Sequence, residues 1–374
     1  MAEMQTQLTP PLLSETLHPV IAEDVHRVIA RTPALERLDG RTILITGGGG
    51  LLASYLVYTV AELNESCLSR PCTLVVTTRR PPADYPRLEP LLDRPDIEWY
   101  QADSAAIAAP VERDVDYVIH AACPASAGGY LAHPLSTARA NSLGLLALLE
   151  LARRVQVGGM LFLSSGQVYG SPPTEHVPTP EDYVGRVDPL AERACYDESK
   201  RFGETLCAVY ARQYGVPVQI VRPVQVYGPG IDPHDDRAFA EFAWSAARGE
   251  PLVVRSDGKD RRSYCYLADA AVMLWHVLLQ GEAGQAYNVG CCEPLVTIRK
   301  LAETIARMAE PPVPVVQHSH QVGSTGSNAP RVSCPDIDKV TRLVGSPPEI
   351  QLEQGFRRVY RWARDSLQQK GPLA

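Results

Sequence analysis

The sequence predicts an α/β fold: a Rossmann-type, doubly wound parallel sheet followed by a smaller C-terminal α/β lobe that binds substrate. Two observations lead to this class. Short apolar strands alternate with helical segments through the first part of the chain, and a glycine-rich turn joins the first of those strands to a helix. Because parallel strands need crossover connections, this alternation is typical of a sheet covered by helices on both faces.

An N-terminal extension, residues 1–40, precedes the first strand. Within it, residues 19–30 carry apolar side chains at helical spacing, from Val20 to Ile29. Such an amphipathic helix is expected to pack on the main domain or on a partner subunit.

Residues 41–226 are expected to form a dinucleotide-binding domain. Its predicted strands cover residues 41–46, 73–78, 97–101, 116–122, 160–164 and 217–221, and its predicted helices cover 51–63, 138–155 and 196–214. The strands are short and mostly apolar, as expected of strands that are buried on both faces.

Residues 227–374 are expected to form mainly the substrate-binding lobe. Proline and glycine interrupt the pattern here, and the predicted helices cover 238–247, 267–279 and 297–309. The stretch from His318 to Ala329 is rich in Ser, Gly and Asn, which predicts a flexible loop.

Composition excludes several classes of protein. The net charge is −7 with no basic block, which argues against nucleic acid as a partner, and no apolar run is long enough to cross a membrane. The N-terminus lacks the pattern of a signal peptide. The nine cysteines form no C-x-x-C pair, so we expect a reduced, cytoplasmic protein, and the histidines show no metal-ligand spacing, so we expect no metal.

The glycine-rich turn is Thr46-Gly47-x-x-Gly50-x-x-Ala53, between a strand and a helix. Glycines there let the backbone approach a pyrophosphate, which then lies at the helix N-terminus. We expect Gly47, Gly50, Leu51 and Leu52 to contact a dinucleotide cofactor.

The second strand ends in Thr77-Thr78-Arg79-Arg80, where an NAD enzyme usually has an acidic residue for the adenosine ribose. Thr78 and Arg79 are expected to contact this end of the cofactor, and Asp103 is expected to contact the adenine. Arg79 and Arg80 could bind the 2′-phosphate of NADP or be solvated surface charges. We nevertheless expect NAD, for the mechanistic reason given below.

Tyr196 and Lys200 are four residues apart, so they share one face of a helix. A free tyrosine, with a pKa near ~10, is a poor base at neutral pH. A neighbouring ammonium and a positively charged nicotinamide both favour the phenolate. The pair therefore predicts hydride transfer from a carbinol.

In combination, these motifs resemble the extended short-chain dehydrogenase/reductases, which modify nucleoside diphosphate sugars. The resemblance covers residues 41–365 and rests on the glycine-rich turn, His120-Ala121-Ala122, Asn141, Ser164-Ser165-x-x-Val168-Tyr169-Gly170 and Tyr196-x-x-x-Lys200. Further segments, Pro124-Ala125-Ser126, Arg193-Ala194-Cys195-Tyr196-Asp197-Glu198 and Arg262-Ser263-Tyr264-x-Tyr266, look like the UDP-glucuronate decarboxylase (UDP-xylose synthase) branch.

The resemblance implies a role for each residue. Tyr196 removes the proton of the sugar 4-hydroxyl while hydride leaves C4, Lys200 binds the nicotinamide ribose and lowers the tyrosine pKa, and Ser165 hydrogen-bonds the reacting oxygen. Ala121, Ala122 and Asn141 are implied on the cofactor side, and Ser126, Gln167, Gln225, Arg237 and Arg262 on the substrate side, with Arg262 holding the diphosphate. A homodimer is also implied, through the helices that carry Asn141 and Tyr196.

Gln167 departs from the family pattern, which usually has a glutamate two residues before Tyr169 in decarboxylases and 4,6-dehydratases. An amide cannot shuttle a proton, so the Gly166-Gln167 pair argues strongly against dehydration and less strongly against decarboxylation. Epimerisation at C4 needs only Tyr196, Lys200 and Ser165. We therefore expect a C4 epimerase first and a UDP-glucuronate decarboxylase as the alternative.

Two further hypotheses remain, a catalytically silent dinucleotide-binding protein and a ketoreductase that consumes NADPH. The intact Tyr196 and Lys200 argue against the silent protein. The epimerase and the decarboxylase both regenerate the cofactor within one cycle, which favours a tightly held NAD.

Overall fold

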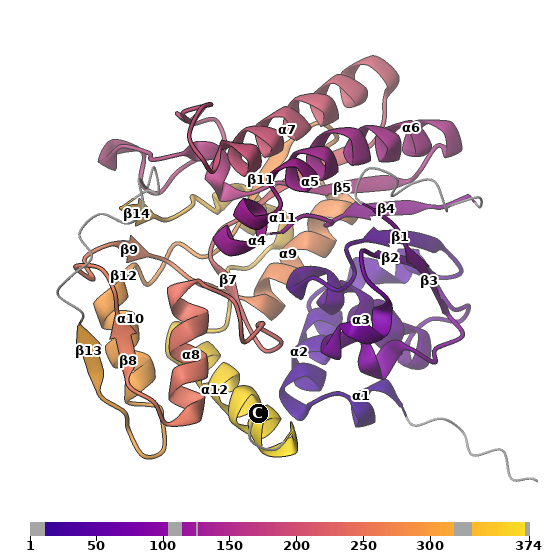
Figure 1. Cartoon of the computed structure of the whole chain (residues 1–374). Coiled ribbons are helices and arrows are strands. Elements are labelled where there is room, and N and C mark those ends of the chain that lie inside the picture. The colour runs from indigo at the N-terminus through magenta and orange to yellow at the C-terminus, as the bar shows by residue number, and fades with distance from the viewer. Residues whose placement is uncertain (1–11, 104–113, 125, 318–330, 371–374) are drawn as a thin grey trace, which may run out of the picture.

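Seven parallel strands form one central sheet in the order β3-β2-β1-β4-β5-β6-β11 (Figure 1). The computed structural model describes residues 12–103, 114–124, 126–317 and 331–370. The strands are β1 (Thr42–Thr46), β2 (Thr73–Thr78), β3 (Ile97–Gln101), β4 (Tyr117–His120), β5 (Gly159–Leu163), β6 (Val218–Pro223) and β11 (Ala286–Val289). The order reverses between β1 and β4, which is where Rossmann-type sheets bind ligands.

Strand β1 shows why the sheet is covered on both faces. All five of its residues are buried. Ile43 and Ile45 belong to one apolar core and Leu44 belongs to the other, because successive side chains of a strand point to opposite faces. The predicted Rossmann-type fold is confirmed.

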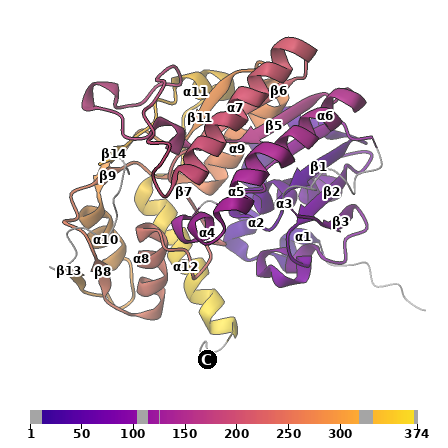
Figure 2. The ribbon, with the colours of Figure 1, turned by 45° about the horizontal axis from the view of Figure 1, so that its top comes forward.

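Two layers of helices enclose the sheet (Figure 2). One layer contains α2 (Pro19–Ala30), α3 (Leu51–Ser66) and α9 (Leu267–Gln280), with the short α1 (Leu13–Thr16) beside them; the other contains α5 (Pro134–Arg139), α6 (Leu145–Val155) and α7 (Ala194–Tyr214), with α4 (Ala127–Ala132) near its end. Helix α2 packs on α3 and α9, one of the two places expected for it. Among the described helices, none has both the length and the apolarity needed to cross a bilayer.

One predicted helix differs from the structure. Instead of one helix over 138–155, the chain forms α5, a π-helical turn at Ala140–Gly144, and then α6. A π turn inserts an extra residue into the helical repeat. Asn141 lies in this turn and is fully buried.

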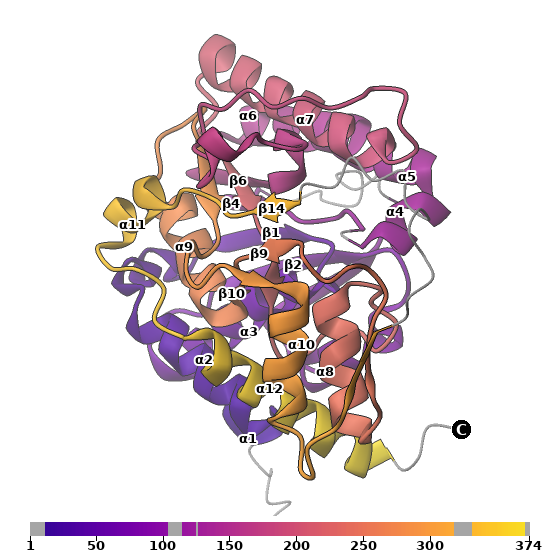
Figure 3. The same cartoon turned by 90° about the vertical axis from the view of Figure 1, so that its left-hand side faces the viewer.

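The smaller lobe lies beyond the carboxyl edge of the sheet (Figure 3). It consists of α8 (Ala238–Arg248), α10 (Ile298–Ala306) and α12 (Leu352–Lys370), with the short strands β7 (Val226–Tyr227), β8 (Leu252–Val254), β9 (Arg261–Arg262), β10 (Cys265–Tyr266), β12 (Val296–Thr297), β13 (Val315–Gln317) and β14 (Val332–Ser333). Helix α11 (Asp338–Val344) and helix α9 pack together beside the main sheet, and β11 joins that sheet. The C-terminal part of the chain therefore contributes to both halves. The loop expected from 318 to 329 lies outside the described residues.

A buried polar cluster ties the N-terminal extension to the last helix. The carboxylate of Asp24, fully buried on α2, accepts hydrogen bonds from the hydroxyls of Tyr55 (3.1 Å) and Tyr266 (2.7 Å) and from the guanidinium of Arg358 on α12 (2.7 Å). Burial raises the pKa of Asp24 to about 6, although Arg358 and both tyrosines act to lower it.

Candidate active site

Two adjoining cavities, of about 410 and 590 Å³, lie at the carboxyl end of the sheet. They share the lining residues Gly50, Leu51, Ala121, Cys123 and Arg237, so they form one continuous groove. The larger cavity runs along the ends of β1 and β2. The smaller one lies between β5, α7 and the small lobe.

The glycine-rich turn lies at the junction of the two cavities. Gly47 has a φ of +71°, and a Cβ on it would lie 2.6 Å from the Cα of Ala122, so no larger residue fits. Helix α3 begins at Leu51 and directs its free backbone N–H groups toward the groove. This arrangement fits the pyrophosphate of a dinucleotide.

The residues expected at the cofactor separate into two groups. Those that line the groove are Gly47, Gly50, Leu51, Leu52, Thr78, Arg79, Ala121 and Ala122. Asp103 is exposed, and it is its neighbour Ala102 that lines the cavity. Ser126, expected on the substrate side, lines the larger, cofactor-side cavity and caps α4 by accepting a hydrogen bond from the Gly129 N–H (3.3 Å).

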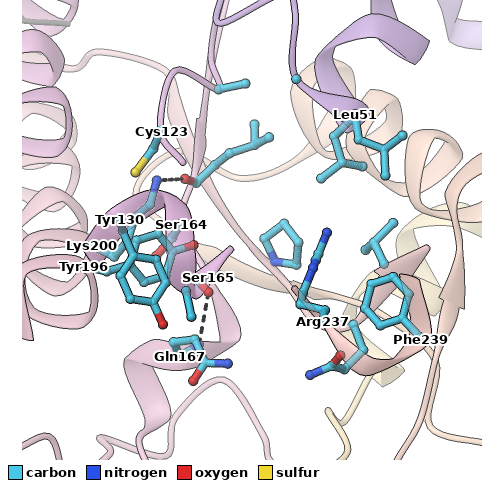
Figure 4. A pocket seen from close by; sticks show the side chains of 18 of the residues that line it. Leu51, Cys123, Tyr130, Ser164, Ser165, Gln167, Tyr196, Lys200, Arg237 and Phe239 are labelled. Atoms are coloured by element: carbon cyan, nitrogen blue, oxygen red, sulfur yellow. Dashed lines mark hydrogen bonds between the residues drawn. The ribbon is translucent and has the colours of Figure 1, made fainter. Parts of the chain in front are cut away.

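The expected catalytic residues lie together on one wall of the smaller cavity (Figure 4). Helix α7 begins two residues before Tyr196 and presents Tyr196 and Lys200 on one face. The Lys200 ammonium donates a hydrogen bond to the carbonyl of Leu163 (2.5 Å) and lies 5.9 Å from the centre of the Tyr196 ring. Ser165 follows β5, and its hydroxyl accepts a hydrogen bond from the Gln167 N–H (3.2 Å).

Burial has the largest effect on the pKa values of Tyr196 and Lys200. Burial, with a smaller contribution from the Cys123 thiol, raises the pKa of Tyr196 above the usual range for tyrosine, and a hydrogen bond with Ser165 lowers it only in part. Burial also lowers the pKa of Lys200. Desolvation is therefore the largest effect at both groups, and the lowering of the Tyr196 pKa by Lys200 stays a prediction.

Arg193 and Tyr130 belong to this wall, although sequence analysis did not select them as site residues. The Tyr130 ring stacks on the Tyr196 ring, with centroids 4.8 Å apart. Arg193 donates hydrogen bonds to the side-chain oxygen of Gln167 (2.8 Å) and to the carboxylate of Asp197 (2.8 Å). The position of Arg193, one turn before Tyr196, could have identified it; nothing in the local sequence distinguishes Tyr130.

Arginines form the opposite wall. Arg237 is paired with Asp235 and lies over the ring of Phe239, 4.7 Å from its centre. Arg262 lines the cavity and donates hydrogen bonds to the carbonyls of Arg261 (2.9 Å) and Arg331 (3.0 Å). Gln225, also in the lining, has a φ of +46°, a strained conformation for a residue other than glycine.

Asn141 lies behind the groove rather than in its lining. Its amide nitrogen donates hydrogen bonds to the hydroxyl of Ser199 (2.9 Å) and to the sulfur of Cys123 (3.3 Å). Its buried side-chain oxygen has no partner among the described residues. Asn141 thus holds Cys123 and the base-bearing helix in place.

Comparison with known proteins agrees with this geometry. Residues 43–290 match the NAD dependent epimerase/dehydratase family. The chain is 34% identical to UDP-glucuronic acid decarboxylase 5 of Arabidopsis thaliana over 84% of this chain and 86% of that protein, and 31% identical to UDP-glucuronic acid decarboxylase 1 of Danio rerio over 89% and 75%. Its fold is similar to that of a UDP-glucose 4-epimerase from Thermotoga maritima solved with UDP-glucose (TM-score 0.73, 25% identity, 87% and 99% of the two chains).

Proposed function

Because this chain belongs to the NAD-dependent epimerase/dehydratase family, we propose that it oxidises C4 of UDP-glucuronate and releases CO₂ from the 4-keto sugar. NAD is the cofactor of the family, as expected from the sequence. The order of the two leading hypotheses is reversed: the named relatives favour the decarboxylase over the epimerase that the residues alone placed first.

One observation carries the choice of a sugar acid. Arg193 and Gln167 both line the smaller cavity, on the same wall as Tyr196. Burial opposes the charge of Arg193, but Asp197 raises the pKa of its guanidinium, so it stays cationic. Gln167, which accepts a hydrogen bond from Arg193, is neutral. Among the described residues, Asp197 is therefore the only one whose carboxylate pairs with Arg193. A planar cation in this position suits the C6 carboxylate of a uronic acid.

The first step is the oxidation of C4, and residues on the two walls of the smaller cavity carry it out. Tyr196 takes the proton of the 4-hydroxyl as a phenolate, which the positive charges of Lys200 and of an oxidised nicotinamide would favour against the burial that raises its pKa. Ser165 hydrogen-bonds the same oxygen. The Lys200 ammonium lies 5.9 Å from the centre of the Tyr196 ring and supplies positive charge next to it. NAD, when bound, accepts the hydride from C4. Arg237 and Arg262 on the opposite wall hold the diphosphate, with Gln225 facing the sugar.

Decarboxylation then follows from the chemistry of the product. With a ketone at C4, the C6 carboxylate is a β-keto acid: the C5–C6 bond breaks, CO₂ leaves, and its electron pair forms an enolate across C4 and C5. A proton must next reach C5. Gln167 cannot supply it. Tyr130 lines the same cavity and stacks on Tyr196, and burial raises the pKa of its hydroxyl, so we assign this donor role to Tyr130. The C4 ketone then regains the hydride while its oxygen takes the proton back from Tyr196, so no cofactor is consumed over the cycle.

Epimerisation at C4 of the same sugar acid is the second candidate. Gln167 supports it, since a ketone that rotates and regains hydride on its other face needs no proton shuttle at that position. Both reactions use the same first step and the same residues.

Mass spectrometry and NMR of a reaction of the protein with NAD and UDP-glucuronate distinguish the two. A product lighter by CO₂ supports decarboxylation, and an isomer of unchanged mass supports epimerisation. If UDP-glucuronate stayed unreacted while UDP-glucose was consumed, the result would contradict the assignment of a sugar acid as the substrate.

We also propose that two copies pair through α5, α6 and α7. These helices pack side by side and carry exposed apolar side chains. We call these side chains the row: Leu135 (63% exposed) on α5, Leu146 (38%) on α6, Phe202 (52%) and Val209 (36%) on α7, together with Leu143 (54%) in the π turn between α5 and α6. A row of this kind on neighbouring helices is costly in water and suits a second, identical surface.

A further inference from the structure

The end of β2 carries cations where a carboxylate would read the adenosine ribose. Thr77, Thr78, Arg79 and Arg80 all line the larger cavity. The backbone carbonyl of Thr77 accepts a hydrogen bond from the Gly48 N–H (3.0 Å), which places the strand end directly beside the glycine-rich turn. The ribose of a dinucleotide whose pyrophosphate lies on that turn therefore reaches these four residues.

Several polar groups at this strand end are free to bind a ligand. The hydroxyl of Thr77 is buried and has no hydrogen-bond partner in the described part of the chain, and the residue is 1% exposed. The guanidinium of Arg79 has neither a hydrogen bond nor an ion pair with a described residue, since Gln101 bonds only its backbone carbonyl. A buried hydroxyl without a partner is costly, and because Thr77 lines the cavity, a polar group bound there would satisfy it.

Arg80 is held at the mouth of the same cavity. Its guanidinium lies over the ring of Tyr85, 4.8 Å from the ring centre. That ring in turn contacts the glycine-rich turn so closely that a Cβ on Gly49 would lie 2.3 Å from Tyr85 Cδ1. The stack fixes Arg80 beside Arg79 and leaves its donors available.

The carboxylates of this cavity do not neutralise the two arginines. They belong to the loop that forms its far side and have other partners. Asp235 is paired with Arg237, Asp236 accepts a hydrogen bond from the Gly128 N–H (2.7 Å), and Asp232 accepts one from the His234 N–H (2.8 Å). The strand end thus combines uncompensated positive charge with a free hydroxyl.

We propose that this strand end is a 2′-phosphate site and that the groove binds NADP in addition to NAD. Arg79 and Arg80 contact the phosphate, and the Thr77 hydroxyl bonds the ribose or the phosphate. The inference rests on the dinucleotide groove alone and is independent of the sugar chemistry proposed above.

Two probes that differ only in the 2′-phosphate test it: 5′-AMP and 2′,5′-ADP (adenosine 2′,5′-bisphosphate), titrated calorimetrically into the protein at one fixed ionic strength. Charge-assisted hydrogen bonds predict that 2′,5′-ADP binds about 10- to 100-fold more tightly. Arg79→Ala should remove most of this ratio while leaving the affinity for 5′-AMP within about threefold. Arg212→Ala, the loss of an exposed arginine on α7, is the matched control and should leave the ratio unchanged.

Equal or weaker binding of 2′,5′-ADP by the wild-type protein would overturn the proposal, and an unchanged ratio in Arg79→Ala would overturn the assignment to this strand end. Arg79 is exposed, so folding should not be affected. NADP⁺ and NAD⁺ are titrated in parallel. Binding of NAD⁺ alone, with sugar turnover intact, would refute this inference and leave the proposed function standing.

Discussion

The rings of Tyr130 and Tyr196 are stacked, with centroids 4.8 Å apart and planes inclined by 15°. The stack buries the face of the proposed base and adds to the desolvation that raises its pKa. It also brings a second phenol into the cavity, from α4 rather than from the helix that carries the base. The two hydroxyls can therefore be tested separately.

Tyr196→Phe removes the base and keeps the ring. We expect turnover of UDP-glucuronate to fall by about 10²- to 10⁴-fold, the usual contribution of a general base, with NAD affinity preserved. Steady-state kinetics and calorimetry measure the two effects. Turnover within tenfold of wild type would mean that another group takes the proton.

Tyr130→Phe keeps the stack and removes only a hydroxyl. If Tyr130 protonates C5, oxidation at C4 continues while product formation slows by about tenfold or more, so NADH accumulates during the reaction. Absorbance at the NADH band reports the accumulation. Wild-type product formation in this variant would leave water as the donor.

The contact between Arg193 and Gln167 predicts selectivity for sugar acids. Replacing Arg193 alone would leave the buried Asp197 without its cation, so the test uses the double variant Arg193→Gln/Asp197→Asn. We expect KM for UDP-glucuronate to rise about 10- to 100-fold. The Kd of UDP, which has no sugar carboxylate, serves as the control and should change little. An equal loss for both ligands would contradict the assignment.

The buried carboxyl of Asp24 predicts a dependence of stability on pH. Its pKa is 3.8 in the unfolded chain and about 6 in the folded protein, so between these values only the folded state keeps the proton. The contribution of Asp24 to stability is therefore complete below pH 4 and is lost as pH rises through 6, by about 3 kcal/mol.

Urea unfolding of the wild type and of Asp24→Asn from pH 4.5 to 7.5 measures this contribution. As pH rises, the free energy of unfolding of the wild type should fall relative to that of Asp24→Asn, because the amide does not titrate. A difference that stays constant would show that Asp24 is ionised in the folded protein across this range.

Most of the sheet and its cofactor turn were predictable from local pattern. The strands before residue 224 and the helices starting at Pro19, Leu51 and Ala238 follow from apolar periodicity and from glycine position. Helix α12 is not among the predicted helices, because its composition is polar on average and its buried side chains, such as Phe356 and Val359, are spread along one face. The π turn at Asn141 is not among the predicted elements either, since that turn depends on tertiary contacts with Cys123 and Ser199.

Some residues of the candidate site were predictable from the sequence, and others were not. Tyr196, Lys200 and Ser165 come from motifs with fixed spacing and lie together as expected. Tyr130 and Arg193 become visible only when α4 and the start of α7 are placed against each other. The pKa of Tyr196 also depends on burial, which no local pattern encodes.

The proposed dimer makes a prediction about a single side chain. Phe202→Glu, in the exposed row of α7, should convert the protein to a monomer in light scattering after size exclusion, because a buried unpaired carboxylate is costly. Leu190→Glu is the control: Leu190 is 92% exposed and lies in a loop outside the row. A wild-type protein that is already monomeric would contradict the proposed pairing.

Asp24 and Arg358 are separated by most of the chain, yet each is the other's closest countercharge. During synthesis, helix α2 emerges long before the arginine that compensates its buried acid. Contacts of such long range form late and slow the search for the native state. The buried acid of α2 therefore gains its countercharge only after α12 has been made, so this cluster is completed near the end of synthesis.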